Sequence, residues 1–267
     1  MNTFLRWAGS KRRILPTLLD AVPRKFNRYV EPFAGSACLF FAISPCRAVL
    51  ADINEDLINA FKMLQCRVED VVTELSRFRC NKEEYYEVRS ESSATLSGAE
   101  KAARFIYLNR FCFNGLYRTN KHGLFNVPYG GLKAGSLPSA DLLRSCAAAL
   151  RRADVISTSF EHTLEAARCG DFVYLDPPYS ISSRRVFNEY SHFSFGKNEL
   201  TRLREHLVRM DKLNIFFLIS YGLSREALEL ARGFFSRQLV VQRQIAGFAN
   251  DRRRSRELLI TNYRLSA

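Results

Sequence analysis

The sequence predicts an α/β protein with a doubly wound sheet, interrupted by an inserted, mainly helical module that carries a β-hairpin. Three observations lead to this prediction. An apolar strand, a turn of small residues, a helix and a second strand ending in an acid follow one another over residues 28–52, which is the order of the nucleotide-binding half of such a fold. A polar, then aromatic and amide-rich stretch follows. Apolar strands then resume and alternate with a helical pattern, as in a parallel sheet.

Local patterns in residues 28–52 predict the first half of the sheet. Residues 28–31 form a short apolar strand, and the small residues at 32–37 make a turn. Apolar residues at 39–43 then predict a helix that packs back on the strand. A second apolar strand, at 48–51, ends at Asp52. This strand, turn, helix, strand and acid form the first nucleotide-binding unit.

The inserted module begins with a helix. Apolar residues recur at helical spacing behind Asn54, which is therefore predicted as the N-cap. The chain stays mainly helical and polar to about residue 103, and is then rich in aromatic and amide side chains. Glycines and a proline in that part imply tight turns, with a hairpin around residues 121–123.

The α/β pattern resumes near residue 153. We therefore expect one domain made of residues 1–55 and 141–267, into which residues 56–140 are inserted. Further strands are predicted at residues 153–156, 172–175 and 215–220, with Leu203, Leu207 and Met210 on an intervening helix.

The charge indicates a polyanionic partner. The chain has 40 Lys and Arg against 27 Asp and Glu, a formal charge of +13, with a pI near 9.6. Nucleic acid is the first candidate, and a membrane surface is the alternative, which lacks the support of a basic amphipathic helix. The basic residues are clustered at 11–13, 151–152, 184–185 and 252–254.

Composition excludes several classes of protein. With 267 residues, 47% hydrophobic and 25% charged, the chain is neither a disordered tail, a fibrous repeat nor a disulfide mini-scaffold. No stretch reaches the roughly 20 apolar residues of a membrane span, and because residues 1–13 contain no apolar h-region we expect no signal peptide. We therefore expect a soluble, cytoplasmic protein. Seven cysteines without a C-x-x-C pair and four scattered histidines predict no metal site.

The sharpest chemical signal is the sequence DPPY at 176–179, directly after the apolar strand FVYL. Ligands of open α/β sheets bind beyond the carboxyl ends of the strands. Two successive prolines fix the backbone, and so hold a carboxylate, a carbonyl and the Tyr179 ring in set positions. These groups suit a planar heterocycle with an exocyclic amine. A Pro-rich turn with no function is the bland alternative.

A second signal is the turn EPFAGSA at 31–37. Its small residues allow backbone N–H groups and a helix N-terminus to approach a polar ligand. Asp52 is the type of acid that binds ribose hydroxyls. Trp7 is flanked by Arg6, Gly9 and Lys11, and we interpret it as a pocket wall rather than a core residue.

At these residues the sequence resembles the Dam-type DNA adenine-N6 methyltransferases, of the D12 class and alpha group. The resemblance covers most of the chain, and the order of its motifs is a trait of that family. The motifs are RWAGSK (6–11), EPFAGSA (31–37), LADIN (50–54), YLNRFCFNGLYRTNKHGLFNVPYG (107–130) and DPPY (176–179).

The resemblance implies a Rossmann-like S-adenosylmethionine-dependent methyltransferase domain with an inserted target-recognition domain. It implies that Asp176 and the Pro177 carbonyl accept hydrogen bonds from the target N6 amine, while Tyr179 stacks on a flipped-out adenine. S-adenosylhomocysteine would be the second product. The implied cofactor-binding residues are Trp7, Lys11, Phe33, Gly35, Asp52, Ser159, Phe160 and Asp176.

The resemblance also implies how DNA is recognised, with GATC as the expected site. Phe113 would be a wedge in the duplex, and Asn114 would lie beside the vacated position. Leu116, Arg118 and Pro128 would face base edges. The sequence departs from the family pattern at three positions: Ala37 replaces a glycine, Arg6 stands where lysine is common, and Gly131 replaces a basic residue of some relatives.

The physical demands of methylating an adenine in a duplex agree with this interpretation. A duplex hides the adenine amine, so an enzyme must extrude the base at a cost of a few kcal/mol. Methyl transfer then needs positioning and charge stabilisation, without a metal or a covalent intermediate. The rival hypotheses are an RNA or protein-glutamine methyltransferase and an inactive DNA-binding regulator. We expect a monomer that acts on double-stranded DNA, with no membrane and no obligate protein partner.

Overall fold

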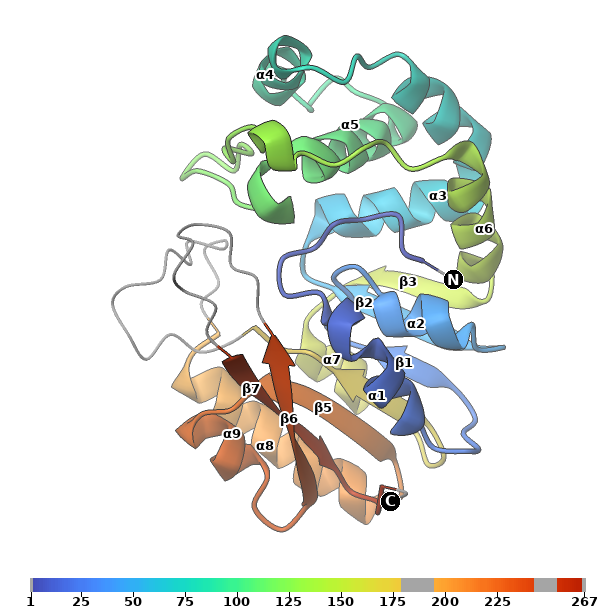
Figure 1. Cartoon of the computed structure of the whole chain (residues 1–267). Helices are drawn as coiled ribbons and strands as arrows, with labels where there is room; N and C mark the ends of the chain where they lie inside the picture. The colour runs from blue at the N-terminus through green and yellow to red at the C-terminus, as the bar shows by residue number, and fades with distance from the viewer. Residues whose placement is uncertain (1, 179–194, 243–253, 266–267) are drawn as a thin grey trace.

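In the computed structural model, residues 2–178, 195–242 and 254–265 are described, and within them seven strands form one sheet (Figure 1). Their order is β3-β2-β1-β4-β5-β7-β6. The first five strands in this order are parallel, and β7 is antiparallel to both of its neighbours. The strands are β1 (Tyr29–Glu31), β2 (Ala48–Asp52), β3 (Ala153–Ser157), β4 (Phe172–Leu175), β5 (Phe216–Gly222), β6 (Phe235–Gln242) and β7 (Arg254–Thr261).

Alternate side chains of the strands enter two apolar layers, as the period of a β-strand requires. Tyr29, Leu50 and Tyr174 belong to the layer that includes α1 and α2. Val30 and Val173 belong to the opposite layer, under α7, α8 and α9. These helices are α1 (Leu15–Asp20), α2 (Cys38–Ile43), α7 (Phe160–Glu165), α8 (Lys197–Lys212) and α9 (Arg225–Leu230). The sheet is therefore covered on both faces, and the predicted Rossmann-like α/β fold is confirmed.

Four further helices lie beyond one end of the sheet, where Figure 1 places α4 and α5 farthest from the strands. Asn54 caps α3 as predicted, because its side chain accepts a hydrogen bond from Leu57 N at 3.0 Å. Leu64 of α3 and Ile106 of α5 join the same apolar layer as Leu50 of the sheet. The helices are α3 (Glu55–Ser76), α4 (Lys82–Ser90), α5 (Gly98–Phe111) and α6 (Ala140–Leu150). None of the described helices is long and apolar enough to cross a membrane.

The predicted hairpin is present. Thr119 and Phe125 form an antiparallel bridge, and Asn126 N donates to Arg118 O at 3.0 Å. Gly123 has a φ of +75°, and its N–H donates to Asn120 O at 2.9 Å, which closes the tip. The hairpin follows a short 3₁₀ helix, η2 (Phe113–Gly115), and precedes another, η3 (Gly131–Lys133).

Candidate active site

The carboxyl ends of the central parallel strands bring the predicted acids to one edge of the sheet. Asp52 is the last residue of β2, Glu31 is the last residue of β1, and Asp176 follows β4 directly. Because β2, β1 and β4 are adjacent and parallel, these three carboxyl groups are close in space although up to 145 residues separate them in the chain. Ligands bind at such an edge in open α/β sheets.

Asp176 is paired with Lys11. Lys11 Nζ lies 2.5 Å from Asp176 Oδ1 and also donates to Gly9 O at 3.3 Å. The lysine side chain is only 5% exposed, and the aspartate side chain is 22% exposed. Such a cation is costly to bury without a partner, so the pair fixes both side chains. Pro177, the next residue, is buried, whereas Tyr179 lies outside the described residues.

Asp52 organises the turn after β1. Its carboxylate accepts hydrogen bonds from Gly35 N at 3.1 Å and from Asn54 N at 3.0 Å. Burial raises the pKa of Asp52 above its usual range, and these N–H donors oppose that shift. Gly35 has a φ of +47°, and a Cβ there would lie 3.0 Å from Cδ1 and Nε1 of Trp7. Trp7 is half-buried and forms a wall against the turn.

Ala37, which stands where the family pattern has a glycine, adopts a left-handed backbone conformation that glycine favours. It is buried, precedes α2 and has a φ of +48°. An L-residue in this region costs roughly 1–2 kcal/mol. The turn therefore adopts this conformation at some cost in stability.

Glu31 is a buried acid beneath this edge. Tyr29 Oη donates to Glu31 Oε2 at 2.8 Å, and both side chains are at most 2% exposed. Burial raises the pKa of Glu31 well above its ordinary value; the hydrogen bond from Tyr29 opposes this, and the charges of Asp176 and Asp52 reinforce it. The sequence pattern predicts no role for Glu31.

An aromatic cluster lies beside the same edge. The rings of Phe33 and Phe160 stack with centroids 5.3 Å apart, and Phe195 contacts both. Thr158 N donates to Asp52 O at 3.2 Å, which ties this cluster to the end of β2. Ser159 is exposed, and its hydroxyl already accepts a hydrogen bond from His162 N as the cap of α7.

The N-terminal motif is anchored to α5 by Asn109. Arg6 N donates to Asn109 Oδ1 at 2.8 Å, and Asn109 Nδ2 donates to Arg6 O at 2.6 Å. Gly115 allows this close packing, since a Cβ there would lie 2.5 Å from Arg6 O. The Arg6 guanidinium donates to Arg110 O at 3.0 Å. Asn109 is missing from the predicted site residues, and its only signal is an amide that directly follows the apolar run FIYL.

The predicted DNA-contacting residues form a second group around the hairpin. Phe113 is 38% exposed, and its backbone N–H donates to Pro128 O at 2.9 Å. Asn114 is exposed with a φ of +55°. Arg118 Nε donates to Asn126 Oδ1 at 2.7 Å across the hairpin, so one edge of the guanidinium is held within the protein.

Comparisons with known proteins identify the family. The profile of the D12 class N6 adenine-specific DNA methyltransferases matches residues 7–245. The chain belongs to this family. The type II methyltransferase M1.LlaDCHI of Lactococcus lactis subsp. cremoris is 34% identical over 98% of this chain and 96% of its own length. The DNA adenine methylase of Haemophilus influenzae is 32% identical over 96% and 92%. The retron Ec67 DNA adenine methylase of Escherichia coli is 33% identical over 97% and 90%.

This D12 class methyltransferase thus has its predicted site residues in two groups. The first group lies at the sheet edge and contains most of the predicted cofactor-binding residues, among them Lys11, Asp52 and Asp176. The second group contains the predicted DNA-contacting residues and surrounds the hairpin. Ala8 N donates to Gly115 O at 3.2 Å, which joins the N-terminal motif to the second group. Among the described residues, no group of three or more His, Cys, Asp or Glu side chains could hold a metal ion.

Proposed function

We propose that this adenine-specific DNA methyltransferase transfers the methyl group of S-adenosylmethionine to N6 of an adenine rotated out of duplex DNA, within the sequence GATC. The observation that carries the proposal is the Lys11–Asp176 pair, 2.5 Å long, at the carboxyl end of β4. It holds a carboxylate at the sheet edge where ligands of this fold bind.

The residues at this edge fit the proposed cofactor. Asp52 has a carboxylate suited to ribose hydroxyls, and Gly35 lets the backbone of the turn approach a ligand. The stacked pair of Phe33 and Phe160 offers an apolar surface for an adenine ring, and Trp7 forms a wall against the turn that holds Gly35. The bound cofactor would supply an electrophilic methyl group. We assign Ser159 a backbone role at most, because its hydroxyl caps α7.

The chemistry we assign to this chain is carried by Asp176. Its carboxylate and the Pro177 carbonyl would accept the two N–H groups of the adenine amine, which orients the nitrogen lone pair. As the nitrogen displaces the sulfonium sulfur from the methyl carbon, the same carboxylate would stabilise the positive charge that develops on the nitrogen, and the methylated amine would then lose one proton to solvent. Lys11 would keep the carboxylate in place between turnovers. Stacking of Tyr179 on the base stays part of the proposal.

The hairpin would perform the recognition. An aromatic wedge such as Phe113 can replace a base in the stack, and an amide such as that of Asn114 can satisfy groups left unpaired. Leu116, Arg118 and Pro128 would face base edges in the major groove, and Arg6 would read a guanine. The proposal includes a monomer acting on double-stranded DNA, with S-adenosylhomocysteine as the second product.

Methyl transfer to plasmid DNA tests this proposal. The protein is incubated with plasmid and S-adenosylmethionine labelled in its methyl group, and the DNA is challenged with nucleases that cut GATC only when its adenine is methylated or only when it is not. We expect labelled DNA that is cut by the first nuclease and protected from the second. Labelled DNA without protection at GATC would refute the proposed sequence. The absence of label with intact DNA binding would refute the donor.

A further inference from the structure

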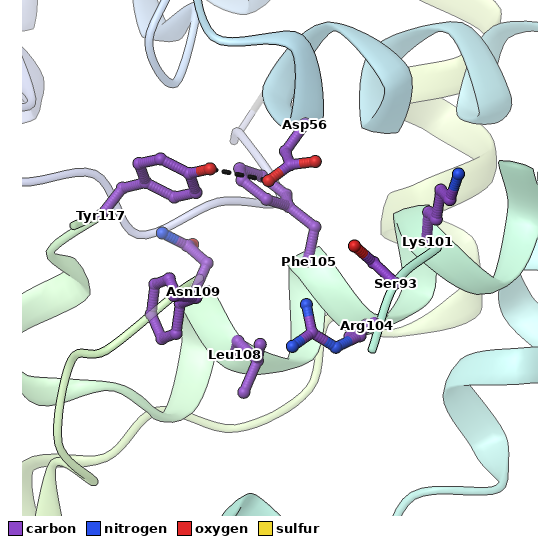
Figure 2. Close-up of a pocket in the computed structure, with 9 residues that line it drawn as sticks. Asp56, Ser93, Lys101, Arg104, Phe105, Leu108, Asn109 and Tyr117 are labelled. Carbon is purple, nitrogen blue, oxygen red and sulfur yellow. Dashed lines mark hydrogen bonds between the residues drawn. The ribbon is translucent and has the colours of Figure 1, made fainter. Parts of the chain in front are cut away.

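The side chain of Tyr117 joins three parts of the molecule. Its hydroxyl donates to Asp56 Oδ2 at 2.6 Å, in the first turn of α3. Its ring stacks on Trp7, with centroids 6.2 Å apart and an interplanar angle of 19°. It also contacts Phe105 of α5 and Phe125 of the hairpin, at 5.7 and 5.8 Å. Figure 2 shows the ring extending from the hairpin strand toward Asp56.

Both Trp7 and Asp56 belong to elements that form the sheet-edge site. Trp7 packs against Gly35, where there is no room for an additional carbon atom without a shift. Asp56 lies in the first turn of α3, two residues after Asn54, whose N–H binds the Asp52 carboxylate. Tyr117 is therefore attached to two walls of the proposed cofactor site.

The backbone of Tyr117 lies between Leu116 and Arg118, two of the proposed base contacts. Leu116 packs, partly buried, against the same apolar layer as Tyr117, and Arg118 donates to Asn126 across the hairpin, so holding the Tyr117 side chain restrains the backbone that carries both neighbours. The hairpin strand is thus fastened to the cofactor site through one side chain.

The surroundings of Tyr117 favour a link rather than a ligand site. A cavity of about 20 Å³ adjoins the Tyr117–Asp56 pair and is also lined by Arg104 and Asn109. This volume holds about one water molecule and excludes a nucleobase. Burial, together with the charge and hydrogen bond of Asp56, raises the pKa of Tyr117, so its hydroxyl stays a donor across the working pH range.

We propose that Tyr117 is a positioning residue that couples occupation of the cofactor site to DNA binding by the hairpin. This inference rests on the proposed function. A ligand that orders Trp7 and the β2–α3 corner would also order Tyr117, and so the strand that carries Leu116 and Arg118. The coupling must be reciprocal, because each ligand changes the affinity of the other by the same factor.

The test compares Tyr117→Phe with the wild type. The dissociation constant of a GATC duplex is measured with and without saturating S-adenosylhomocysteine, and that of S-adenosylhomocysteine with and without duplex. We expect a coupling factor of about fivefold or more in the wild type. In Tyr117→Phe it should fall at least threefold toward one, while each affinity measured alone changes less than about twofold. Asp56→Ala should reproduce the loss, and Asp56→Asn, which keeps an acceptor, should retain most of the coupling.

Tyr107→Phe is the matched control, because it also removes one tyrosine hydroxyl. The Tyr107 hydroxyl donates to Arg79 O at 2.8 Å, and the Tyr107 ring contacts Phe78, Tyr85 and Phe111 rather than Trp7 or Asp56. It should leave the coupling factor unchanged. Equal coupling in the wild type and Tyr117→Phe, or no coupling in the wild type, would overturn the inference. Failure of the proposed function would look different, since the wild type would then not bind S-adenosylhomocysteine or the duplex at all.

Discussion

The sheet edge and the hairpin differ in how far their side chains are buried and paired within the protein. At the sheet edge, the charged groups of Lys11, Asp52 and Asp176 have partners within the protein and are partly or wholly buried. Around the hairpin, Phe113 and Leu124 are exposed, the latter by 56%. The first region is organised before any ligand arrives, whereas the second presents its side chains outward.

This difference indicates which task each region suits. Chemistry on a small group needs reacting atoms held in advance, because a preorganised polar site pays no reorganisation cost during the reaction. Recognition of a duplex needs an accessible surface with cationic and apolar side chains. Between the two, Arg118 is a mixed case, since its guanidinium is exposed to solvent only in part and is held by Asn126.

The largest effect is expected from Asp176→Ala, which removes the central group of the sheet edge. The rate of methyl transfer should fall by about 1,000-fold, or about 4 kcal/mol of activation free energy. Binding of duplex should change less than about twofold, because affinity comes mainly from contacts with phosphates. Single-turnover rates and equilibrium binding check both parts. Retention of more than a tenth of the rate would assign the chemistry elsewhere.

The salt dependence of duplex binding should distinguish the side of the molecule that carries the hairpin from the opposite side. If the DNA-facing side neutralises about four phosphates, the affinity should fall about 100-fold between 50 and 200 mM salt. Lys121→Ala, at the exposed hairpin tip, should reduce the log–log slope by about one. Residues 151–152 directly precede β3, at the amino ends of the strands, and Arg152 donates to Ser44 there. Their replacement by alanine should leave the slope unchanged, and an equal loss would contradict the one-sided arrangement.

Arg118→Ala tests whether the hairpin reads a base. A guanidinium that reads a guanine contributes roughly 1–3 kcal/mol of discrimination. Methylation of GATC should therefore fall by about ten- to a hundred-fold, with much smaller losses on duplexes altered at one guanine. Asn126→Ala, which frees the held edge of the guanidinium, should give a weaker effect of the same kind. Equal losses on matched and altered duplexes would make Arg118 a phosphate contact.

The smallest effect concerns stability beneath the sheet edge. The raised pKa of Glu31 means that its contribution to stability is complete below its ordinary pKa and is lost as the pH rises toward the folded value. Glu31→Gln removes this ionisation. Relative to the wild type, the variant should gain on the order of 1 kcal/mol between pH 5 and pH 8. Urea unfolding at the two pH values measures this, with exposed Glu83→Gln as the control. A pH-independent difference would contradict a raised pKa for Glu31.

Local patterns predict most of the sheet and the ends of its strands. The strands leading to Asp52 and Asp176, the cap at Asn54 and the hairpin tip all have nearby signals, and all are confirmed. The strands β6 and β7 are missing from the prediction. β6 lies at the edge of the sheet and exposes Val240 by 65%, so its polarity does not alternate in the regular way of a half-buried strand.

Such local patterns do not predict contacts between residues that are far apart in the sequence. Lys11 and Asp176 are 165 residues apart, and Asp56 and Tyr117 are 61 apart. A periodic pattern reports which side of an element is buried, but not which residue it meets. The pairing of Arg6 with Asn109 escapes prediction for the same reason.

One measurement tests most directly whether chemistry and recognition lie in these two regions. Two duplexes, one containing GATC and one altered at a single guanine, are treated with labelled S-adenosylmethionine, and N6-methyladenine is quantified in the digested DNA. We expect strong methylation of the first duplex only by the wild type, similar low levels on both duplexes by Arg118→Ala, and essentially none on either by Asp176→Ala. Unchanged preference in Arg118→Ala together with residual activity in Asp176→Ala would contradict the division between the sheet edge and the hairpin.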